Sequence, residues 1–250
     1  MLSKIQKAVE NQEKIVADLR ELKAATIAKL FREGLRGEPL KQTEIGEVPG
    51  NWQIKALTAC CEKPQYGYTE SSSEKPIGPK FLRITDLTEN GVDWESVPYC
   101  KCSEDDFIKY QLKSGDILVA RIGATTGKNH LIVSCPKAVF ASYLIRLRAK
   151  PDLAPKFLSN FMDSAIYWKQ VRATKGQNLK GGMSGAILSQ ILMPFPSEPE
   201  QKEISDAVTI INRNISYAVE KYLHAKVLFS STLNQLMTGK VRVSVPLGDG

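Results

Sequence analysis

The chain has 250 residues, of which 42% are hydrophobic and 24% charged, and this composition is sufficient for one or two soluble domains with a proper core. No apolar run approaches the ~20 residues that span a bilayer, and the N-terminus reads as a charged amphipathic helix, not a signal sequence. We therefore expect a cytoplasmic protein without a membrane segment. Its five cysteines should be reduced thiols, and their spacing matches no zinc ribbon or finger, so no metal site is expected.

The first 34 residues carry the alternating four- and three-residue spacing of apolar side chains that predicts a long helix with a coiled-coil seam. Gln12, Lys23 and Thr26 occupy seam positions with polar side chains, so this helix should be stable only when it is paired. Gly34 follows the last seam residue and predicts the end of the helix.

The central part of the chain begins with a connector over residues 35–52, which is rich in glycine and proline and lacks periodicity. Several short strands should follow, with a turn at Glu89-Asn90-Gly91 between two of them. The expected strands are Gln53–Ala59, Phe81–Leu87, Asp116–Ile122, Leu131–Ser134 and Val139–Arg148.

A helix is expected over Pro155–Arg172, where aromatic and apolar residues recur at helical spacing. This stripe is more typical of a core-facing side than of a base-stacking platform. Thr174–Gly185 contains four glycines and predicts an exposed loop, and the short apolar segment Ala186–Phe195 leads into the second long helix.

Residues 197–238 repeat the seam of the first helix, shifted by 206 positions. Ser197 and Glu200 predict a capping box, in which the Glu200 carboxylate reaches back to Ser197, and Gly239 predicts the end of the helix. Because the first helix leads into the central domain and the second leads out of it, the two should pair antiparallel. The residues expected to pair them are Ile5, Val9, Val16, Leu30, Val208, Ile211, Ile215, Tyr222, Phe229 and Leu236.

The net charge of +7 is unevenly distributed along the chain. Residues 41–120 carry nine Lys and Arg against thirteen Asp and Glu, whereas residues 121–180 carry eleven basic residues against Asp152 and Asp163 alone. Such a basic run predicts a phosphate-binding surface, with a solvated basic face as the alternative.

The sequence contains no recognisable set of catalytic residues. The stretch Gly115–Lys128 resembles a phosphate-binding loop, but its glycine spacing is too short for one, and Asn129 stands where such a loop needs Ser or Thr. We interpret it as a strand-loop-strand tip that contacts phosphates or base edges. His130 and His224 should be solvated or packed, and no nucleophile elbow, methyltransferase cofactor loop or nuclease motif is present. We therefore expect a non-catalytic protein without a cofactor.

The chain resembles the specificity subunit of type I restriction–modification systems over essentially its whole length, because several sequence stretches match that family in their order and spacing. The matching stretches are GEPLKQTEIGEVPGNW, FLRITDLTENG, GDILVARIGATTGK, AVFASYLIRLR and GQNLKGGMSGAILSQILMPFPSEPEQKEI. The resemblance implies an α+β fold, in which a mixed α/β target-recognition domain is flanked by two long antiparallel coiled-coil helices. The implied parts are a first conserved spacer helix (1–36), the recognition domain (37–198), a second conserved spacer helix (199–239) and a C-terminal tail (240–250).

The family has two recognition domains, so this chain looks like a half-size specificity subunit or the second half of a full one. The resemblance implies that it reads part of a bipartite target in double-stranded DNA. It also implies docking of modification (methyltransferase) subunits on the helices and, through them, of restriction (translocase-nuclease) subunits. The chain would read the bipartite target alone, as a homodimer or beside a second half-subunit. The alternative interpretation is a coiled-coil assembly protein whose basic central domain binds RNA or an acidic protein.

The family motifs carry over no fixed base-contacting residue, so the candidate DNA-binding residues follow from residue type and expected loop position. They are Tyr66, Tyr68, Arg83, Arg121, Thr125, Thr126, Lys128, Lys175, Gln177, Asn178, Lys180 and Ser184.

Overall fold

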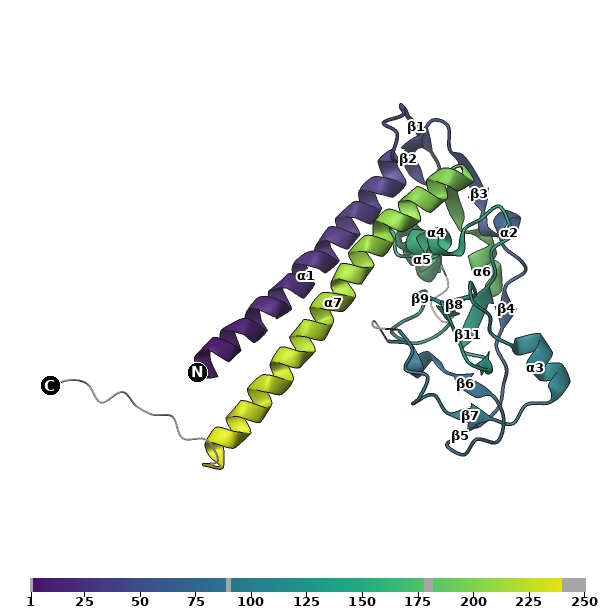
Figure 1. Cartoon of the computed structure of the whole chain (residues 1–250). Helices are drawn as coiled ribbons and strands as arrows, with labels where there is room; N and C mark the ends of the chain where they lie inside the picture. Colours follow the sequence, from purple (N-terminus) through teal and green to yellow (C-terminus); the bar gives the residue numbers. More distant parts are fainter. Residues whose placement is uncertain (1, 89–90, 178–181, 240–250) are drawn as a thin grey trace. The chain divides into compact units, whose positions relative to one another are not determined.

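The computed structural model of the chain describes residues 2–88, 91–177 and 182–239. The chain forms two compact units (Figure 1), a globular one of residues 24–208 and a helical one that joins the first 23 residues to the segment after residue 208. The globular unit thus includes the last turns of the first long helix and the first turns of the second. The turn expected at Glu89-Asn90-Gly91 lies partly outside the described residues.

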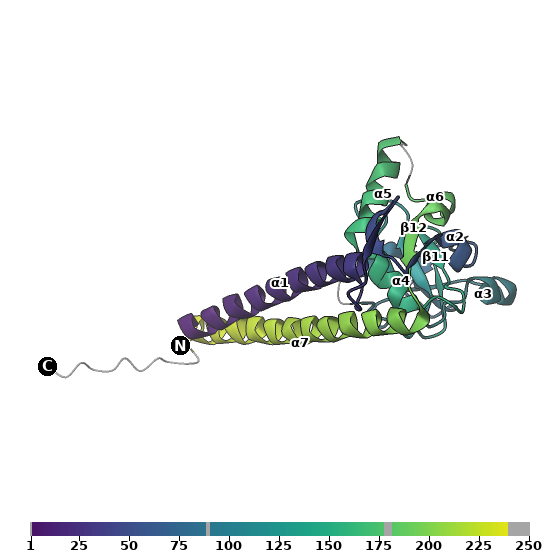
Figure 2. The same cartoon turned by 90° about the horizontal axis from the view of Figure 1, so that it is seen from above.

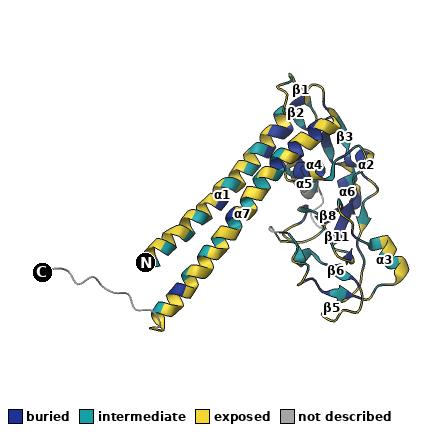
Figure 3. Ribbon diagram, viewed as in Figure 1, coloured by how far each residue is buried: buried dark blue, intermediate teal, exposed yellow. Residues whose placement is uncertain are grey.

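The helical unit, called the arm below, consists of the outer parts of α1 (Leu2–Glu33) and α7 (Glu198–Met237). The two helices lie side by side and run antiparallel (Figures 1 and 2), so the expected coiled-coil arrangement is confirmed. Within the arm, the apolar seam residues are half-buried or, at Val16 and Ala218, buried, and they form a stripe along both helices (Figure 3).

Both long helices end at the predicted glycines. Gly34 has φ +64° and Gly239 has φ +67°, a left-handed conformation that glycine adopts without steric cost. The Gly34 N–H donates to the Leu30 carbonyl at 3.1 Å, and the Gly239 N–H donates to the Leu236 carbonyl at 3.2 Å.

Two four-stranded sheets form the centre of the globular unit. The first is antiparallel, in the order β4-β11-β8-β9, and the second has the order β10-β6-β7-β5 with β10 parallel to β6. The strands of the first are β4 (Gln65–Tyr66), β11 (Leu144–Leu147), β8 (Ile117–Ala120) and β9 (Asn129–Leu131). Those of the second are β10 (Ala138–Phe140), β6 (Lys80–Leu82), β7 (Tyr99–Cys100) and β5 (Ser72–Ser73).

The connector and the end of the unit contain two further strand pairs. A hairpin of β1 and β2 lies in the connector, and β3 pairs with β12. The bounds are β1 (Leu40–Thr43), β2 (Gly46–Pro49), β3 (Gln53–Ala56) and β12 (Leu192–Phe195). The remaining helices are α2 (Leu57–Cys60), α3 (Glu104–Tyr110), α4 (Pro155–Met162), α5 (Ala165–Gln177), α6 (Gly185–Gln190) and the 3-10 helix η1 (Ile84–Asp86).

Strand β8 is buried on both faces because it lies between two layers of core. Its residues Ile117 and Val119 join a cluster with the helices, including Phe31 of α1 and Phe157 of α4, whose ring centroids are 5.1 Å apart. Leu118 points to the other side, into the cluster between the two sheets. This alternation follows from the two-residue period of a strand and makes the first sheet the rigid middle layer of the unit.

Several segments differ from the sequence prediction. The strand expected over Gln53–Ala59 ends at Ala56, where α2 follows, and the one expected over Phe81–Leu87 ends at Leu82, before η1. The strand expected over Leu131–Ser134 lies earlier in the chain, since β9 ends at Leu131.

The strand expected over Val139–Arg148 is two strands, because the chain bends at residues 141–143 and passes from the second sheet to the first. The helix expected over Pro155–Arg172 breaks at Ser164, whose hydroxyl accepts from the Tyr167 N–H and starts a new helix. The loop expected over Thr174–Gly185 is shorter, since α5 continues to Gln177 and Ser184 caps α6.

Within the described residues, no helix is both long enough and apolar enough to cross a membrane.

Candidate nucleic-acid interface

Arg121 lies directly after β8, and its main chain is held on both sides. Its N–H donates to the Tyr143 carbonyl at 2.9 Å, and its carbonyl accepts from the Met183 N–H at 2.8 Å. Gly182 passes so close that a side chain there would collide with the Arg121 carbonyl. The segment after residue 181 is therefore packed directly against the end of β8.

The side chain of Arg121 stacks on Tyr66. The guanidinium carbon lies 4.9 Å from the centre of the tyrosine ring, a distance typical of a cation–π contact. The ring is itself held, because the Tyr66 hydroxyl accepts from the Gly185 N–H at 3.0 Å. Tyr66 is 40% exposed and Arg121 is half-buried, so the stack lies at the surface.

A buried cluster of Arg146, Asp116 and Arg148 holds in place the strand that carries Tyr66. Arg146 of β11 is 5% exposed, lies 3.5 Å from the Asp116 carboxylate and donates to the side chain of Gln65. Arg148 closes the cluster with a 2.7 Å bond from Nε to Asp116. Burial lowers the pKa of Arg146, whereas the bond to Asp116 raises the pKa of Arg148. Because Gln65 precedes Tyr66 in β4, this cluster fixes the strand that carries the aromatic ring.

The structure brings together three of the candidate residues, Tyr66, Arg121 and Ser184, on this surface. Ser184 has a local role as well, since its hydroxyl accepts from the Ile187 N–H and caps α6. Thr125 and Lys128 are exposed in the turn that follows Arg121. We call Tyr66, Arg121, Thr125, Lys128 and the main chain of 182–185 the Arg121 surface.

Three candidates are engaged elsewhere. Thr126 is 7% exposed, and its hydroxyl donates to the Gly123 carbonyl at 2.7 Å, so it stabilises the turn. Arg83 lies between β6 and η1, and its guanidinium donates twice to Asp86, which raises its pKa. The Tyr68 ring packs on Tyr110 with ring centroids 5.2 Å apart. The side-chain polar groups of Thr126 and Arg83 are thus bonded within the chain, and the Tyr68 ring is held against Tyr110.

The remaining candidates lie near a gap in the described chain. Lys175 and Gln177 belong to the last turn of α5, and Asn178 and Lys180 lie outside the described residues. The described C-terminal end of α5 and helix α6 lie on the same side of the unit (Figure 2).

Tyr143 was not predicted from the sequence. It is 55% exposed, and its carbonyl accepts from the Arg121 N–H, which makes the two residues cross-strand neighbours. The sequence signal was weak, because Tyr143 lay inside what looked like a continuous strand; only the bend at residues 141–143 places it at a strand start.

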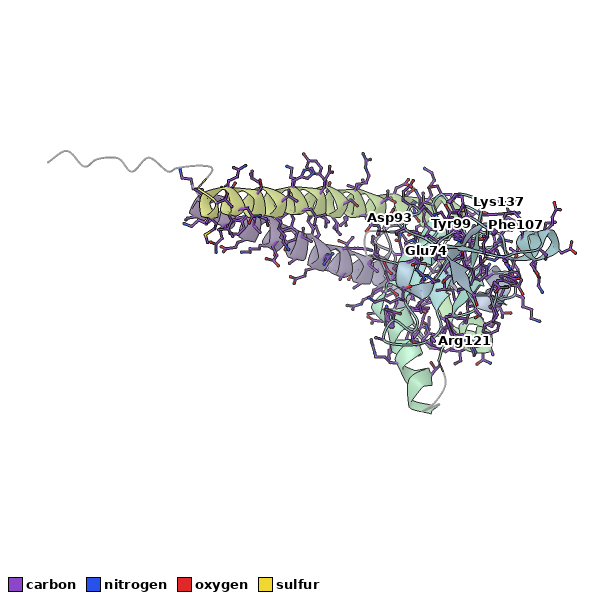
Figure 4. The ribbon with its side chains drawn as sticks, turned by 90° about the horizontal axis from the view of Figure 1, so that it is seen from below. Glu74, Asp93, Tyr99, Phe107, Arg121 and Lys137 are labelled. Atoms are coloured by element: carbon purple, nitrogen blue, oxygen red, sulfur yellow. The ribbon has the colours of Figure 1, made fainter. Side chains whose placement is uncertain are left out.

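Acidic side chains gather away from the Arg121 surface. Exposed carboxylates flank β5, precede β7 and begin α3, and Figure 4 shows Glu74 and Asp93 well separated from Arg121. The described members of this acidic face are Glu70, Glu74, Asp93, Glu95, Glu104 and Asp105. A polyanion would be repelled by that face and attracted to the Arg121 surface.

A largely apolar groove of about 780 Å³ lies elsewhere on the globular unit, between β9 and the first turns of α7. Leu131, Val133, Pro155 and Pro199 line it, and charged residues of both signs also line it, namely Lys156, Lys202, Glu198 and Asp206. No group of three or more His, Cys, Asp or Glu side chains is placed to hold a metal ion in the ranges that the structure describes.

The chain was compared with known protein families, sequences and structures. No protein-family model matches the chain. Over 97% of its length it is 25% identical to the type I restriction enzyme MjaVIII specificity subunit of Methanocaldococcus jannaschii, of which it covers 59%. The chain is similar to type I specificity subunits. It is also 24% identical, over 70% of its length, to the EcoKI specificity subunit of Escherichia coli, of which it covers 39%.

Solved structures of specificity subunits share the fold. The HsdS subunit from Thermoanaerobacter tengcongensis matches 96% of the chain with a TM-score of 0.58 and 15% identity, over 56% of its own length. The S subunit from M. genitalium matches 94% of the chain with a TM-score of 0.64 and 13% identity, over 58% of its own length. The resemblance seen in the sequence is thus confirmed, and the chain spans between 39 and 59% of the relatives that it matches in sequence.

Proposed function

We propose that this chain acts as a DNA-specificity subunit of a type I restriction–modification enzyme, with the one recognition domain described here. The globular unit binds part of a bipartite duplex target, and the arm docks the modification subunits. The observation that carries the proposal is the Arg121 surface, where a guanidinium held over Tyr66 at the end of β8 is followed by a turn with exposed Thr125 and Lys128. The likeness to specificity subunits over nearly the whole chain supports it.

The separation of charge supports DNA as the ligand. Arg121 and Lys128 stand on the Arg121 surface, whereas the exposed carboxylates follow the second sheet and α3. Specific protein–DNA interfaces combine Lys and Arg contacts to phosphates with side chains that reach base edges. A stacked arginine beside an exposed lysine and threonine provides both kinds of contact.

Exposed apolar side chains on the arm support docking of another protein. Ile210, Tyr217 and Leu228 of α7 are 60, 60 and 56% exposed. They are seven and eleven residues apart, which places them within about 20° of one another around an α-helix. An apolar stripe of this kind marks a protein-binding surface, and modification subunits are the occupant that the proposal assigns to it.

The proposal assigns no catalytic residue and no cofactor to this chain. Methyl transfer and DNA cleavage would reside in the modification and restriction subunits. The rest of the bipartite target would be read by a second recognition domain, for which a second copy of this chain or another half-subunit is a candidate.

A salt-dependent mobility shift on duplex DNA tests the proposal. Neutralising Arg121 and Lys128 together, as R121Q and K128Q, should weaken binding and lower the slope of log K against log salt by about one to two units. The matched control K75Q and K101Q removes the same charge from exposed lysines near the acidic face, and its slope should stay within about half a unit of wild type.

The same assay is run with and without the modification subunit, and with RNA of equal length. Equal or tighter binding to RNA would favour the RNA-binding assembly protein instead. If R121Q with K128Q leaves the duplex affinity and its salt slope unchanged, the DNA surface lies elsewhere on the chain.

A further inference from the structure

We infer that Arg121 reads a guanine in the major groove of the DNA target. This inference rests on the proposed function and deepens it, because it assigns one base type to one side chain. Four features of the structure carry it: a fixed main chain, a stacked guanidinium, the absence of a carboxylate partner and the geometry of its hydrogen-bond donors.

The main chain of Arg121 cannot shift without breaking two hydrogen bonds. One runs from its N–H to Tyr143, and the other from Met183 to its carbonyl. The residue also continues β8, whose Ile117, Leu118 and Val119 are fully buried. A base-reading side chain anchored on a rigid strand end keeps its position when the duplex arrives.

The guanidinium is restrained in the same way. It lies over the Tyr66 ring, and that ring is fixed by the bond from Gly185 and by the pairing of β4 with β11. Stacking covers one face of the planar guanidinium and leaves the N–H donors along its edge uncovered. Arginine ordered in this way loses less conformational entropy on binding than a free side chain does.

No carboxylate competes for these donors. Among the described residues, Arg121 has no ion-pair partner, whereas Arg83 is bound to Asp86 and Arg146 and Arg148 to Asp116. The labelled acidic residues Glu74 and Asp93 lie away from it in Figure 4. The donors of Arg121 are therefore available to a ligand.

Guanine matches these donors better than the alternatives. Its major-groove edge offers two acceptors, O6 and N7, to the two parallel N–H groups of a guanidinium, whereas adenine pairs N7 with a donor. A phosphate can also accept two N–H bonds from this fork, but it offers the same acceptors at every position of the duplex. Only a contact with the guanine edge would make binding depend on one base, so the sequence preference distinguishes the two ligands.

The test uses the full chain, alone and with its modification subunit, in a selection from duplex DNA with a randomised core. The wild-type chain should enrich sequences with an invariant guanine. Replacing that guanine by 7-deazaguanine, which lacks N7, should weaken binding about 5- to 100-fold, whereas inosine, which keeps O6 and N7, should not.

Arg121→Lys keeps the charge but not the fork, and it should lose the preference at that one position. Tyr66→Leu should weaken the same preference, because the guanidinium is no longer held. Arg172→Lys, at an exposed arginine of α5, should leave the enriched sequence unchanged. Circular dichroism and urea unfolding of each variant establish that the fold is kept.

Each other outcome overturns a different statement. If Arg121→Lys lowers affinity equally for all sequences, Arg121 contacts phosphate and the guanine assignment is wrong. If the wild-type sequence has no invariant guanine, or if its preference survives in Arg121→Lys, the assignment is also wrong. If no sequence is enriched either with or without the modification subunit, the proposed function itself fails.

Discussion

Trp52 donates its indole Nε1–H to the Glu200 carboxylate at 3.0 Å, across 148 residues of sequence. The other carboxylate oxygen accepts from the Leu35 N–H at 3.3 Å. Gly34 leaves room for this contact, because a side chain there would press on Trp52, Pro49 and the carboxylate itself. Glu200 was expected to reach back to Ser197; instead it joins the end of α1 to the start of α7.

Glu200→Ala should lower the free energy of unfolding by about 2–4 kcal/mol, because it leaves the buried indole N–H and the Leu35 N–H without an acceptor. Glu200 is only 2% exposed, so water cannot replace the carboxylate without opening the site. Urea unfolding of the full chain measures the change.

Glu203→Ala is the matched control. Glu203 stands three residues further along α7, and its bond to Arg36 lies at the surface. Exposed ion pairs contribute at most about 1 kcal/mol, so this variant should unfold close to wild type. Equal losses of unfolding free energy in both variants would mean that the Trp52–Glu200 contact contributes no more than an exposed ion pair.

Asp116→Asn should destabilise the globular unit by about 3–5 kcal/mol, since it leaves the buried Arg146 without its counter-charge. Arg146 also donates to the carbonyls of Lys109 and Gln111 at the end of α3, so hydrogen exchange should rise first in that helix. Asp152→Asn, whose partner Lys55 lies nearer the surface, is the control and should cost less than about 1 kcal/mol. Unchanged exchange in α3 would contradict this coupling.

Ile211→Asp should unpair the arm. Ile211 is a half-buried seam residue, and an unpaired charge in the seam costs several kcal/mol. We expect lower helicity by circular dichroism and loss of modification-subunit binding, while the globular unit keeps its strand signal and weak DNA binding. Ile210→Asp places the same charge on the neighbouring residue, which is 60% exposed, and should keep the helicity. Intact helicity in both variants would show that the seam is incidental.

Tyr217→Ser with Leu228→Ser should abolish capture of the modification subunit without lowering the free energy of unfolding. Both side chains are more than half exposed, so little packing is lost when they are truncated. Glu220→Ser, at an exposed polar position of the same helix, should bind as wild type. Pull-down and analytical sizing distinguish the variants, and normal capture by the double variant would move the docking site off this stripe.

The stability of the globular unit should fall as the pH is lowered through the range of histidine titration. Burial lowers the pKa of His130 in β9, so the folded state favours the neutral ring. The unfolded chain takes up the proton near the ordinary value of about 6.5, and stability that is present above this pH is lost below it.

His130→Gln should flatten this part of the pH profile, measured by urea unfolding between about pH 7.5 and pH 5.5. His224→Gln changes the exposed histidine of α7 and should keep the wild-type profile. An unchanged slope in His130→Gln would assign the pH dependence to other groups.

The long helices could be predicted because their signals are local. The seam repeats every seven residues, and the glycines that end each helix act on the last turn alone, so Gly34 and Gly239 could be placed without knowledge of the fold. Short strands are less well determined, because burial on both faces removes their alternation. The segment Val139–Arg148 therefore looked like one strand, although it belongs to two sheets.

The sequence by itself determined the two helices, the basic run after residue 120 and the likeness to specificity subunits, since period, charge and motif order are properties of the chain alone. Only the tertiary structure decided which basic side chains remain available. It paired Arg83 with Asp86, buried Arg146 beside Asp116 and turned Thr126 inward. It placed the Arg121 guanidinium over the ring of Tyr66, whose hydroxyl accepts a hydrogen bond from Gly185, 119 residues away in the sequence. Such contacts depend on long-range strand pairing, and no local pattern in the sequence encodes them.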